Sequence, residues 1–285
     1  MFEDYSNASI DIINEDVAQN IKGIISKKFS LDLTFFDSFV FRRRLTIALS
    51  FLRILPENIV SKTQKFNTET IDILMSFLHP CETELFRDTD TWIFLRDKIL
   101  QKVISSNNAN ILIYNATSGE DLYSILMLIN EYFPLINTEI TVTSPSQYSL
   151  KNISEGIFAQ HKNRSFLLNY KAIFGNKDAS KYMEINNNNL LFKKNFLNNV
   201  IYKIHVPGKN TDTDFKQFDL VICRNKMLPF TIEKSEVFFE EIITFLKPKG
   251  YLVIGTNENL PPKNESAFQV ISFNKKIFLK KTDDK

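Results

Sequence analysis

Several features that mark specialised proteins are scarce in this 285-residue sequence, and each shortage narrows the class of protein. It has 7 glycines and 9 prolines, so we expect no long flexible linkers. Its two cysteines cannot build a disulfide framework and favour a cytosolic protein with reduced thiols. A net charge of +2 provides no strongly basic surface, so we predict no nucleic-acid partner.

Long hydrophobic runs are also missing. No apolar stretch approaches the ~18 residues of a membrane span, so we predict no membrane insertion. Residues 1–5 lack the basic and apolar regions of a signal peptide, and we therefore expect a cytoplasmic protein. The histidines and cysteines are scattered without the spacing of metal ligands, so we predict no metal site. What remains is an ordinary globular composition, 44% hydrophobic and 24% charged.

The pattern of the sequence changes near residue 105. Before it, apolar residues recur at helical spacing and predict helices at 10–28, 35–52, 68–78 and 89–103. Asp88 is the expected N-cap of the last helix. Residues 105–108 are Ser-Ser-Asn-Asn, which indicates a linker. We therefore predict an all-α N-terminal domain at 1–104.

From Ile111 onward, short apolar strands alternate with helices, which is typical of a mostly parallel sheet covered on both faces. We predict an α/β domain at 109–285 with a Rossmann-like, doubly wound sheet. Residues 160–217 fit the alternation poorly and include four consecutive asparagines at 186–189. An inserted subdomain or a cover over the active site is expected there.

The stretch 111–124 is the most informative one. An apolar strand enters a turn of small residues, and Glu120 and Asp121 open the next helix. The turn lets a ligand approach the backbone, and the helix start offers free N–H groups. The acidic pair has the wrong charge for a phosphate, but it suits a ligand with an amine and a ribose, such as S-adenosylmethionine.

Four segments in this order resemble the CheR-type chemotaxis receptor methyltransferases, and the resemblance spans about residues 12 to 282. Each segment alone is weak, but the four together indicate a divergent member of that family. They are Thr83–Asp88, Thr117–Ser124, Phe218–Asn225 and Leu246–Leu252.

The resemblance implies methyl transfer from S-adenosylmethionine to glutamate side chains of a chemoreceptor or related signalling protein. It implies a small β subdomain within 160–217, and it assigns no catalytic residue. Arg87 and Thr83 would hold the cofactor carboxylate, and Glu120 or Asp121 its amino group. The remaining expected cofactor contacts are Ser144, Asn225 and Lys226.

Each of these residues also has a structural interpretation. Arg87 could form a salt bridge between domains, and Thr83 could cap a helix. The acidic pair could be a solvated first helical turn, where acids are favoured anyway, and Asn225 could form a turn.

Arg42, Arg43 and Arg44 lie on the second predicted helix. By resemblance, a basic face there meets the acidic methylation helices of a receptor. Consecutive helical residues point in different directions, so the three cannot all serve one surface. A solvated helix face is the alternative interpretation.

Departures from the family pattern gather around the cofactor positions. Ser144 stands where an acidic residue would hold the ribose, Val206 replaces an asparagine and Pro229 replaces a tyrosine. These changes support a rival hypothesis, a pseudoenzyme that keeps the fold as a binding or scaffold module. A small-molecule methyltransferase is a third hypothesis, and the helical N-terminal domain argues against it.

Overall fold

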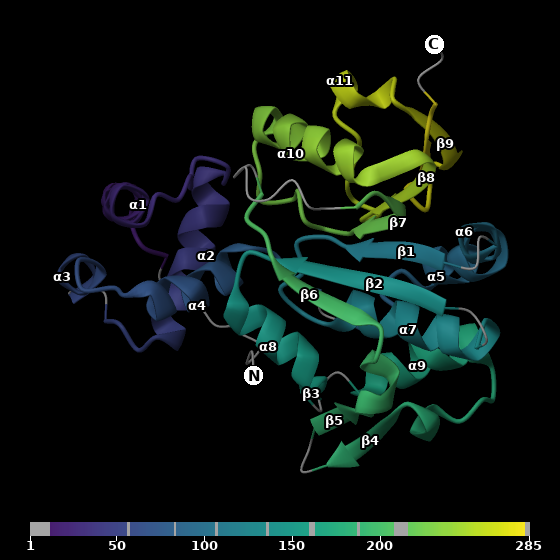
Figure 1. Ribbon diagram of the computed structural model, residues 1–285. Helices are drawn as coiled ribbons and strands as arrows, with labels where there is room; N and C mark the ends of the chain where they lie inside the picture. Colours follow the sequence, from purple (N-terminus) through teal and green to yellow (C-terminus); the bar gives the residue numbers. More distant parts are fainter. Residues whose placement is uncertain are drawn as a thin grey trace.

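The computed structural model describes residues 12–55, 58–82, 84–105, 108–134, 137–159, 163–186, 189–207 and 216–282. Within these ranges, a group of N-terminal helices lies beside a sheet of seven strands (Figure 1). Among the described helices, none combines the length and the apolar character needed to cross a membrane.

Among the described residues, four helices form the N-terminal part. They are α1 (Glu15–Phe29), α2 (Ser38–Phe51), α3 (Ile59–Thr63) and α4 (Thr68–Leu78). Three of them begin after a residue whose side chain accepts a backbone N–H, namely Asn14, Asp37 and Asn67. The inward side chains form an apolar core of their own, built around fully buried residues such as Ile21, Leu45 and Leu74.

The central sheet has the strand order β6-β2-β1-β7-β8-β10-β9. Its parallel strands are β6 (Val200–Ile204), β2 (Asn137–Ser144), β1 (Asn108–Ile113), β7 (Phe218–Cys223) and β8 (Leu246–Ile254). An antiparallel strand, β10 (Ile277–Lys280), joins β8 to β9 (Phe268–Ser272). The order reverses beside β1, which confirms the predicted Rossmann-like α/β fold and marks the usual ligand position of such sheets.

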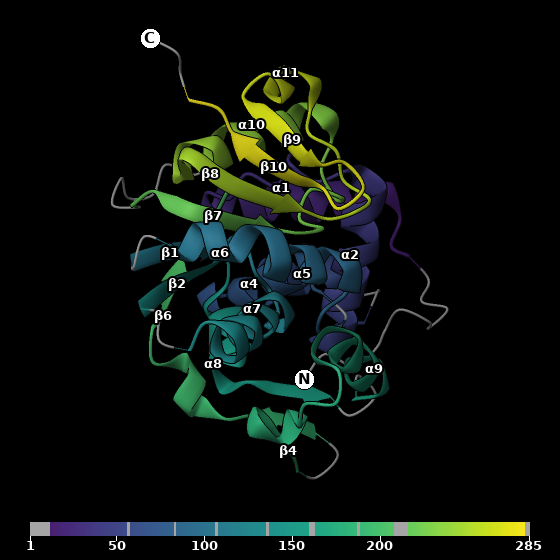
Figure 2. The ribbon, with the colours of Figure 1, turned by 90° about the vertical axis from the view of Figure 1, so that its right-hand side faces the viewer.

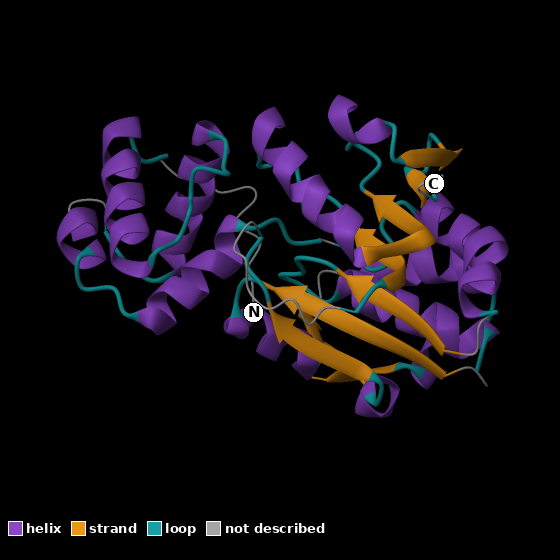
Figure 3. Cartoon of the chain, turned by 45° about the horizontal axis from the view of Figure 1, so that its top comes forward, coloured by secondary structure: helices purple, strands orange, loops and turns teal. Residues whose placement is uncertain are grey.

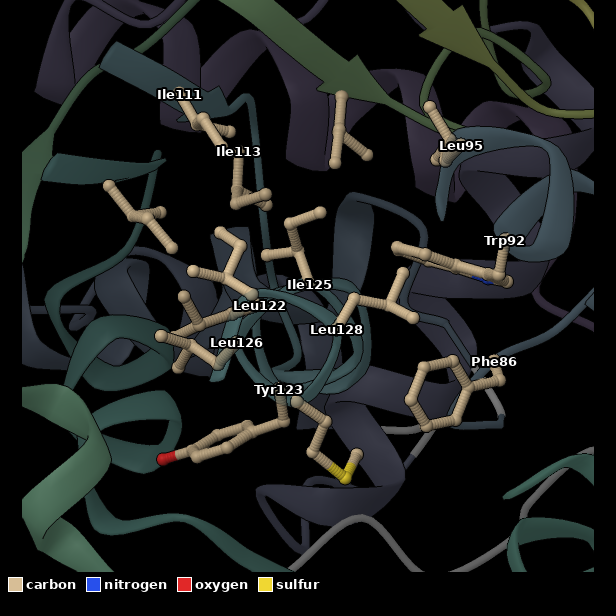
Figure 4. Packing of buried hydrophobic residues seen from close by; sticks show 14 of the residues in the cluster. Phe86, Trp92, Leu95, Ile111, Ile113, Leu122, Tyr123, Ile125, Leu126 and Leu128 are labelled. Carbon is tan, nitrogen blue, oxygen red and sulfur yellow. The ribbon is translucent and has the colours of Figure 1, made fainter. Parts of the chain in front are cut away.

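Helices cover both faces of this sheet, with α7 (Glu120–Tyr132) and α10 (Ile232–Phe245) on opposite sides (Figure 2). Ile111 and Ile113 of β1 pack with Leu122 of α7 in one buried cluster (Figure 4). Between them in sequence, Leu112 packs with Phe238 of α10 in a second cluster. Because both faces are buried there, β1 ends in a continuous apolar run, Ile111–Ile113, rather than an alternating one.

Several short helical segments also follow the four N-terminal helices in the sequence. They are α5 (Thr89–Phe94), a π-helical turn (Leu95–Leu100), α6 (Gln101–Ile104), α8 (Gln147–Glu155) and α11 (Pro262–Glu265). The first three continue one another, where a single helix was predicted at 89–103.

The segment 160–217 is only partly an insertion. Outside the central sheet lie α9 (Asn163–Phe174), two 3-10 turns (Ala179–Lys181 and Lys194–Leu197) and a small sheet of β3 (Ile157–Ala159), β5 (Asn189–Phe192) and β4 (Met183–Asn186).

The last strand of that segment, β6, pairs with β2 at the edge of the central sheet. The sequence-based prediction, which assigned these residues to the insertion, is wrong at this point. Ile201 is 38% exposed and Ile204 is 48% exposed. An edge strand with such exposure has no buried apolar run by which the sequence could reveal it.

The N-terminal helices adjoin the carboxyl edge of the sheet, since the arrowheads of the parallel strands point toward them (Figure 3). The N–H of Asp37 donates to the carbonyl of Pro229 at 2.7 Å. Next to this contact, Phe36 and Phe230 form a short antiparallel bridge and pack their rings together. The edge where ligands bind in doubly wound sheets is therefore bordered by both parts of the chain.

Asp72 of α4 provides a testable link between the two parts. Its carboxylate accepts the N–H groups of Gln147 and Tyr148, both at 2.7 Å, at the start of α8. These N–H groups have no partner inside the helix. We expect Asp72→Asn to lower the free energy of unfolding by about 1 kcal/mol, because the amide keeps one acceptor oxygen and loses the charge that favours a helix start.

Urea denaturation measures this loss. Glu236→Gln is the matched control, because it removes a carboxylate from the middle of α10 that caps no helix. Equal stability of the Asp72→Asn protein and the wild type would contradict a linking role for Asp72.

Candidate functional site

Four segments meet at the carboxyl edge of the sheet. They are residues 80–82 with 84–88 after α4, residues 115–121 after β1, residues 223–227 at the end of β7 and residues 255–258 after β8. Three of these leave neighbouring parallel strands, so the topology alone brings them together. The first segment comes from the N-terminal side and is held against them by hydrogen bonds.

Those hydrogen bonds involve both backbone and side chains. The hydroxyl of Thr117 and the ammonium of Lys226 both donate to the carbonyl of Pro80, at 2.7 and 3.0 Å. The N–H of Glu82 donates to the hydroxyl of Ser118 at 2.9 Å. The 80–88 segment thereby becomes one wall of the site.

Arg224, which is fully buried, holds three of the elements together. Its guanidinium contacts Asp121 of α7 at 3.2 Å and Asp88, just before α5, at 2.6 Å. It also donates to the carbonyl of Arg87 at 2.9 Å and lies over the ring of Trp92. Asp88 occupies the predicted N-cap position of α5, but its φ is 55° and its side chain caps no amide of the helix, because the carboxylate turns to Arg224 instead.

Glu258 fixes the loop that follows β7. Its carboxylate accepts the N–H groups of Asn225, Met227 and Gly255, at 2.8, 2.7 and 2.7 Å. Burial raises the pKa of Glu258 above its usual range, and the three N–H groups oppose that effect. Gly255 is required here, because a Cβ at that position would collide with the amide of Asn225.

Glu82 occupies the centre of the site. Its side chain is 2% exposed, and both carboxylate oxygens face the amide nitrogen of Asn225, at 3.0 and 3.3 Å. A guanidinium nitrogen of Arg87 lies 4.0 Å away. Glu82 therefore stands between two residues that the sequence assigned to the cofactor.

Negative charge is in excess here. Burial and the neighbouring Glu82 raise the pKa of Asp121 to about 7, although Arg224 opposes the shift. Among the described residues of the site, two cations are buried, Arg224 and Lys226. The buried carboxylates there are four, namely Glu82, Glu120, Asp121 and Glu258. Such a site favours a ligand that brings positive charge.

His79 closes the N-terminal side of the site. Its Nδ1 lies 3.1 Å from the amide nitrogen of Asn115, which follows β1, and its ring packs against Phe36. Burial, with the charges of Arg44 and Lys226, lowers the pKa of His79 to about 3. The imidazole is therefore neutral and can accept the amide hydrogen of Asn115.

Most of the residues predicted to bind the cofactor share this site. Those in the converging segments are Arg87, Glu120, Asp121, Asn225 and Lys226. Thr83 lies outside the described residues. Ser144 is buried at the end of β2, where its hydroxyl accepts the N–H of Ser146 at 3.3 Å.

Three buried charged residues of the site were not predicted. Arg224 lies inside one of the four recognised segments, between Cys223 and Asn225, so its position was available as a signal. Glu258 ends the Gly-Thr-Asn-Glu stretch after β8. Nothing in the sequence identified Glu82 as a site residue, because the residues around it come from distant segments and no local pattern indicates a buried carboxylate.

Comparison with known proteins identifies the class to which this fold and site belong. Residues 81–277 match the family model "CheR methyltransferase, SAM binding domain". The chain therefore belongs to the CheR methyltransferases, and its cofactor is S-adenosylmethionine.

The names of two relatives agree with this family. A chemotaxis protein methyltransferase of Borreliella burgdorferi is 27% identical over 276 residues, which are 89% of this chain and 91% of that protein. A Pseudomonas putida protein named as methyltransferase Cher3 is 24% identical, covering 82% of this chain and 85% of its own length. A solved class I S-adenosylmethionine-dependent methyltransferase of Listeria monocytogenes is 12% identical, with a TM-score of 0.39, and the match covers 95% of this chain and 90% of that one.

The charges of the site fit S-adenosylmethionine. This molecule carries an ammonium and a sulfonium against one carboxylate, so its net charge is positive. The surplus of buried carboxylates and the raised pKa of Asp121 are features of a site that takes a cation. The exposed fraction of the Arg87 side chain, 36%, leaves its guanidinium accessible to the ligand's carboxylate.

The raised pKa of Asp121 predicts how stability varies with pH. Between the usual pKa of 3.8 and about 7, the folded protein retains a proton that the unfolded chain has lost. Stability should therefore fall as the pH rises from about 4 to about 7 and level off above, with a slope of at most about 1.4 kcal/mol per pH unit. Asp121→Asn should remove this part of the dependence.

Denaturation of the ligand-free protein at several pH values measures the slope. Glu131→Gln is the control: despite some burial, hydrogen bonds from Lys177 and Tyr182 lower the pKa of Glu131 to about 2, so that carboxylate stays charged over most of this range. An unchanged slope in the Asp121→Asn protein would refute the assignment of this proton.

Proposed function

We propose that this protein transfers methyl groups from S-adenosylmethionine to glutamate side chains of a chemoreceptor or a related signalling protein. The observation that carries the proposal is the convergence of Arg87, Asp121 and Asn225 at the carboxyl edge of a CheR-family sheet. The names of the relatives support a role in chemotaxis.

Each side chain has a distinct task in this proposal. Arg87 binds the carboxylate of the cofactor, since a guanidinium presents two parallel donors to it. Glu120 and Asp121 accept the ammonium, and Asn225 holds the same end through its amide. The hydroxyl of Ser144 serves the ribose. Lys226 and Thr83 complete the predicted set of contacts.

The chemistry requires little of the protein beyond positioning. When bound, S-adenosylmethionine supplies a methyl group on a positively charged sulfur, which an attacking carboxylate oxygen takes as the carbon–sulfur bond breaks. A glutamate carboxylate is already a nucleophile at neutral pH, so the chain needs no general base. Its residues orient the reactants and keep the site dry and electrostatically matched.

Arg43 is the arginine of α2 that we assign to the acidic partner. Arg42 contacts Glu15 at 3.6 Å and donates to a backbone carbonyl. Arg44 donates to the carbonyls of Phe77 and His79, and burial lowers its pKa. Arg43 is exposed, so its charge is available to a partner.

A binding module without activity is the second candidate. The observation that favours it concerns Ser144, which stands where an acidic residue would hold the ribose. Its single hydroxyl is buried and is already hydrogen-bonded to Ser146. Calorimetric titration with S-adenosylmethionine and S-adenosylhomocysteine separates the two candidates. A micromolar dissociation constant favours the enzyme, and no heat at millimolar ligand favours the module.

Arg87→Met tests the proposed cofactor anchor. We expect the dissociation constant for S-adenosylhomocysteine to rise about 10- to 100-fold, because a charge-assisted, bidentate contact is lost. Arg43→Met is the matched control and should bind the ligand as the wild type does. The same affinity in both variants would exclude Arg87 from the binding site.

Arg43→Glu tests the partner surface. Formation of base-labile methyl esters on a receptor signalling fragment should slow about tenfold or more at low salt, because like charges now oppose docking. The affinity for S-adenosylhomocysteine should stay unchanged. Arg53→Glu, the same charge reversal at an exposed residue outside α2, is the control. A normal methylation rate in the Arg43→Glu protein would remove this residue from the interface.

A further inference from the structure

Glu82 is held in a fixed position at the centre of the site. Its N–H donates to the Ser118 hydroxyl at 2.9 Å, and that hydroxyl lies 3.4 Å from the Glu82 carbonyl. Ser118 belongs to the loop between β1 and α7, so this backbone contact fixes Glu82 beside the start of α7. With 2% of its surface exposed, the carboxylate cannot turn into solvent without moving the segment.

The carboxylate of Glu82 has few hydrogen-bond donors for a buried group. Two ionised oxygens can accept about four hydrogen bonds. Among the described residues, the amide nitrogen of Asn225 is the single group within hydrogen-bond distance of them. Arg87 lies 4.0 Å away, which is too far for a hydrogen bond. A buried charge with so few partners is costly unless a ligand completes its environment.

Glu82 could act on the cofactor in two ways, which have opposite effects on the affinity for that cofactor. If Glu82 took the place of the cofactor's carboxylate beside Arg87, it would compete with that group and weaken binding. If it received the ammonium, it would strengthen binding. The surplus of negative charge decides between them, because Glu120 and Asp121 are buried in the same site. A further anion at Glu82 would meet repulsion, whereas an ammonium brings three donors and a charge.

We propose that Glu82 is a binding residue for the ammonium end of the cofactor's methionine chain, which it shares with Asp121. This inference rests on the proposed function, because it concerns the same ligand. Glu82 then makes the site selective for ligands that retain the amino-acid end. It also explains why this chain buries a carboxylate between Arg87 and Asn225, where a neutral residue would cost less.

Glu82→Gln separates this role from a structural one. The glutamine oxygen can still accept the amide hydrogen of Asn225, so that contact is retained while the charge is removed. Glu84→Gln is the matched control: it makes the same change two residues along, at a partly exposed carboxylate whose contact is with Asn169 at 3.4 Å.

Calorimetric titration of both variants and the wild type with two ligands gives the test. S-adenosylhomocysteine keeps the amino-acid end, and 5′-methylthioadenosine lacks it. We expect Glu82→Gln to weaken binding of S-adenosylhomocysteine about 10- to 100-fold. Binding of methylthioadenosine should stay the same or tighten, which also shows that the variant is folded. Glu84→Gln should change neither affinity.

Each of the other outcomes would overturn a specific claim. Unchanged or tighter binding of S-adenosylhomocysteine by Glu82→Gln would overturn the inference and leave the proposed function intact. Equal weakening of both ligands would also overturn it, because the effect would then be a general loss of the pocket. Failure of the wild type to bind either ligand at millimolar concentration would overturn the proposed function, and this inference with it.

Discussion

The buried guanidinium of Arg224 is the interaction on which the site depends. It reaches from the end of β7 to Asp121 at the start of α7 and to Asp88 before α5, so one side chain fixes three elements. Removing one partner of a buried ion pair commonly costs 3–5 kcal/mol, about as much as a large cavity in a core. Arg224 is therefore a structural cation, and the carboxylates around it are held in place by it.

That arrangement leaves a surplus of negative charge, and the surplus has a functional meaning. Arg224 balances only part of the charge of Asp121 and Glu82, as the raised pKa of Asp121 indicates. A site built for stability alone would pair every buried carboxylate or replace it with an apolar residue. Functional sites commonly retain such unbalanced charge because the ligand completes it.

The N-terminal helices contribute to the same site rather than forming a remote module. Asp72 caps α8, His79 contacts Asn115, and Pro80 accepts hydrogen bonds from Thr117 and Lys226 of the site. The segment that contains Pro80 also carries Glu82, which accepts a hydrogen bond from Asn225. The proposed partner surface on α2 and the site at the sheet are therefore connected through this segment.

The sequence by itself determined the class of fold, and it pointed to several residues that converge at the carboxyl edge of the sheet. Buried strands such as Ile111–Ile113 and capped helices such as α4 follow local rules of period and capping. The motif segments placed Asp121 at the start of a predicted helix and Asn225 after a predicted strand. Tertiary structure alone decided that β6 is an edge strand, that Asp88 faces Arg224 and that Glu82 is buried. The reason is physical: periodicity reports which side of an element is apolar, but burial and charge pairing depend on residues far apart in sequence.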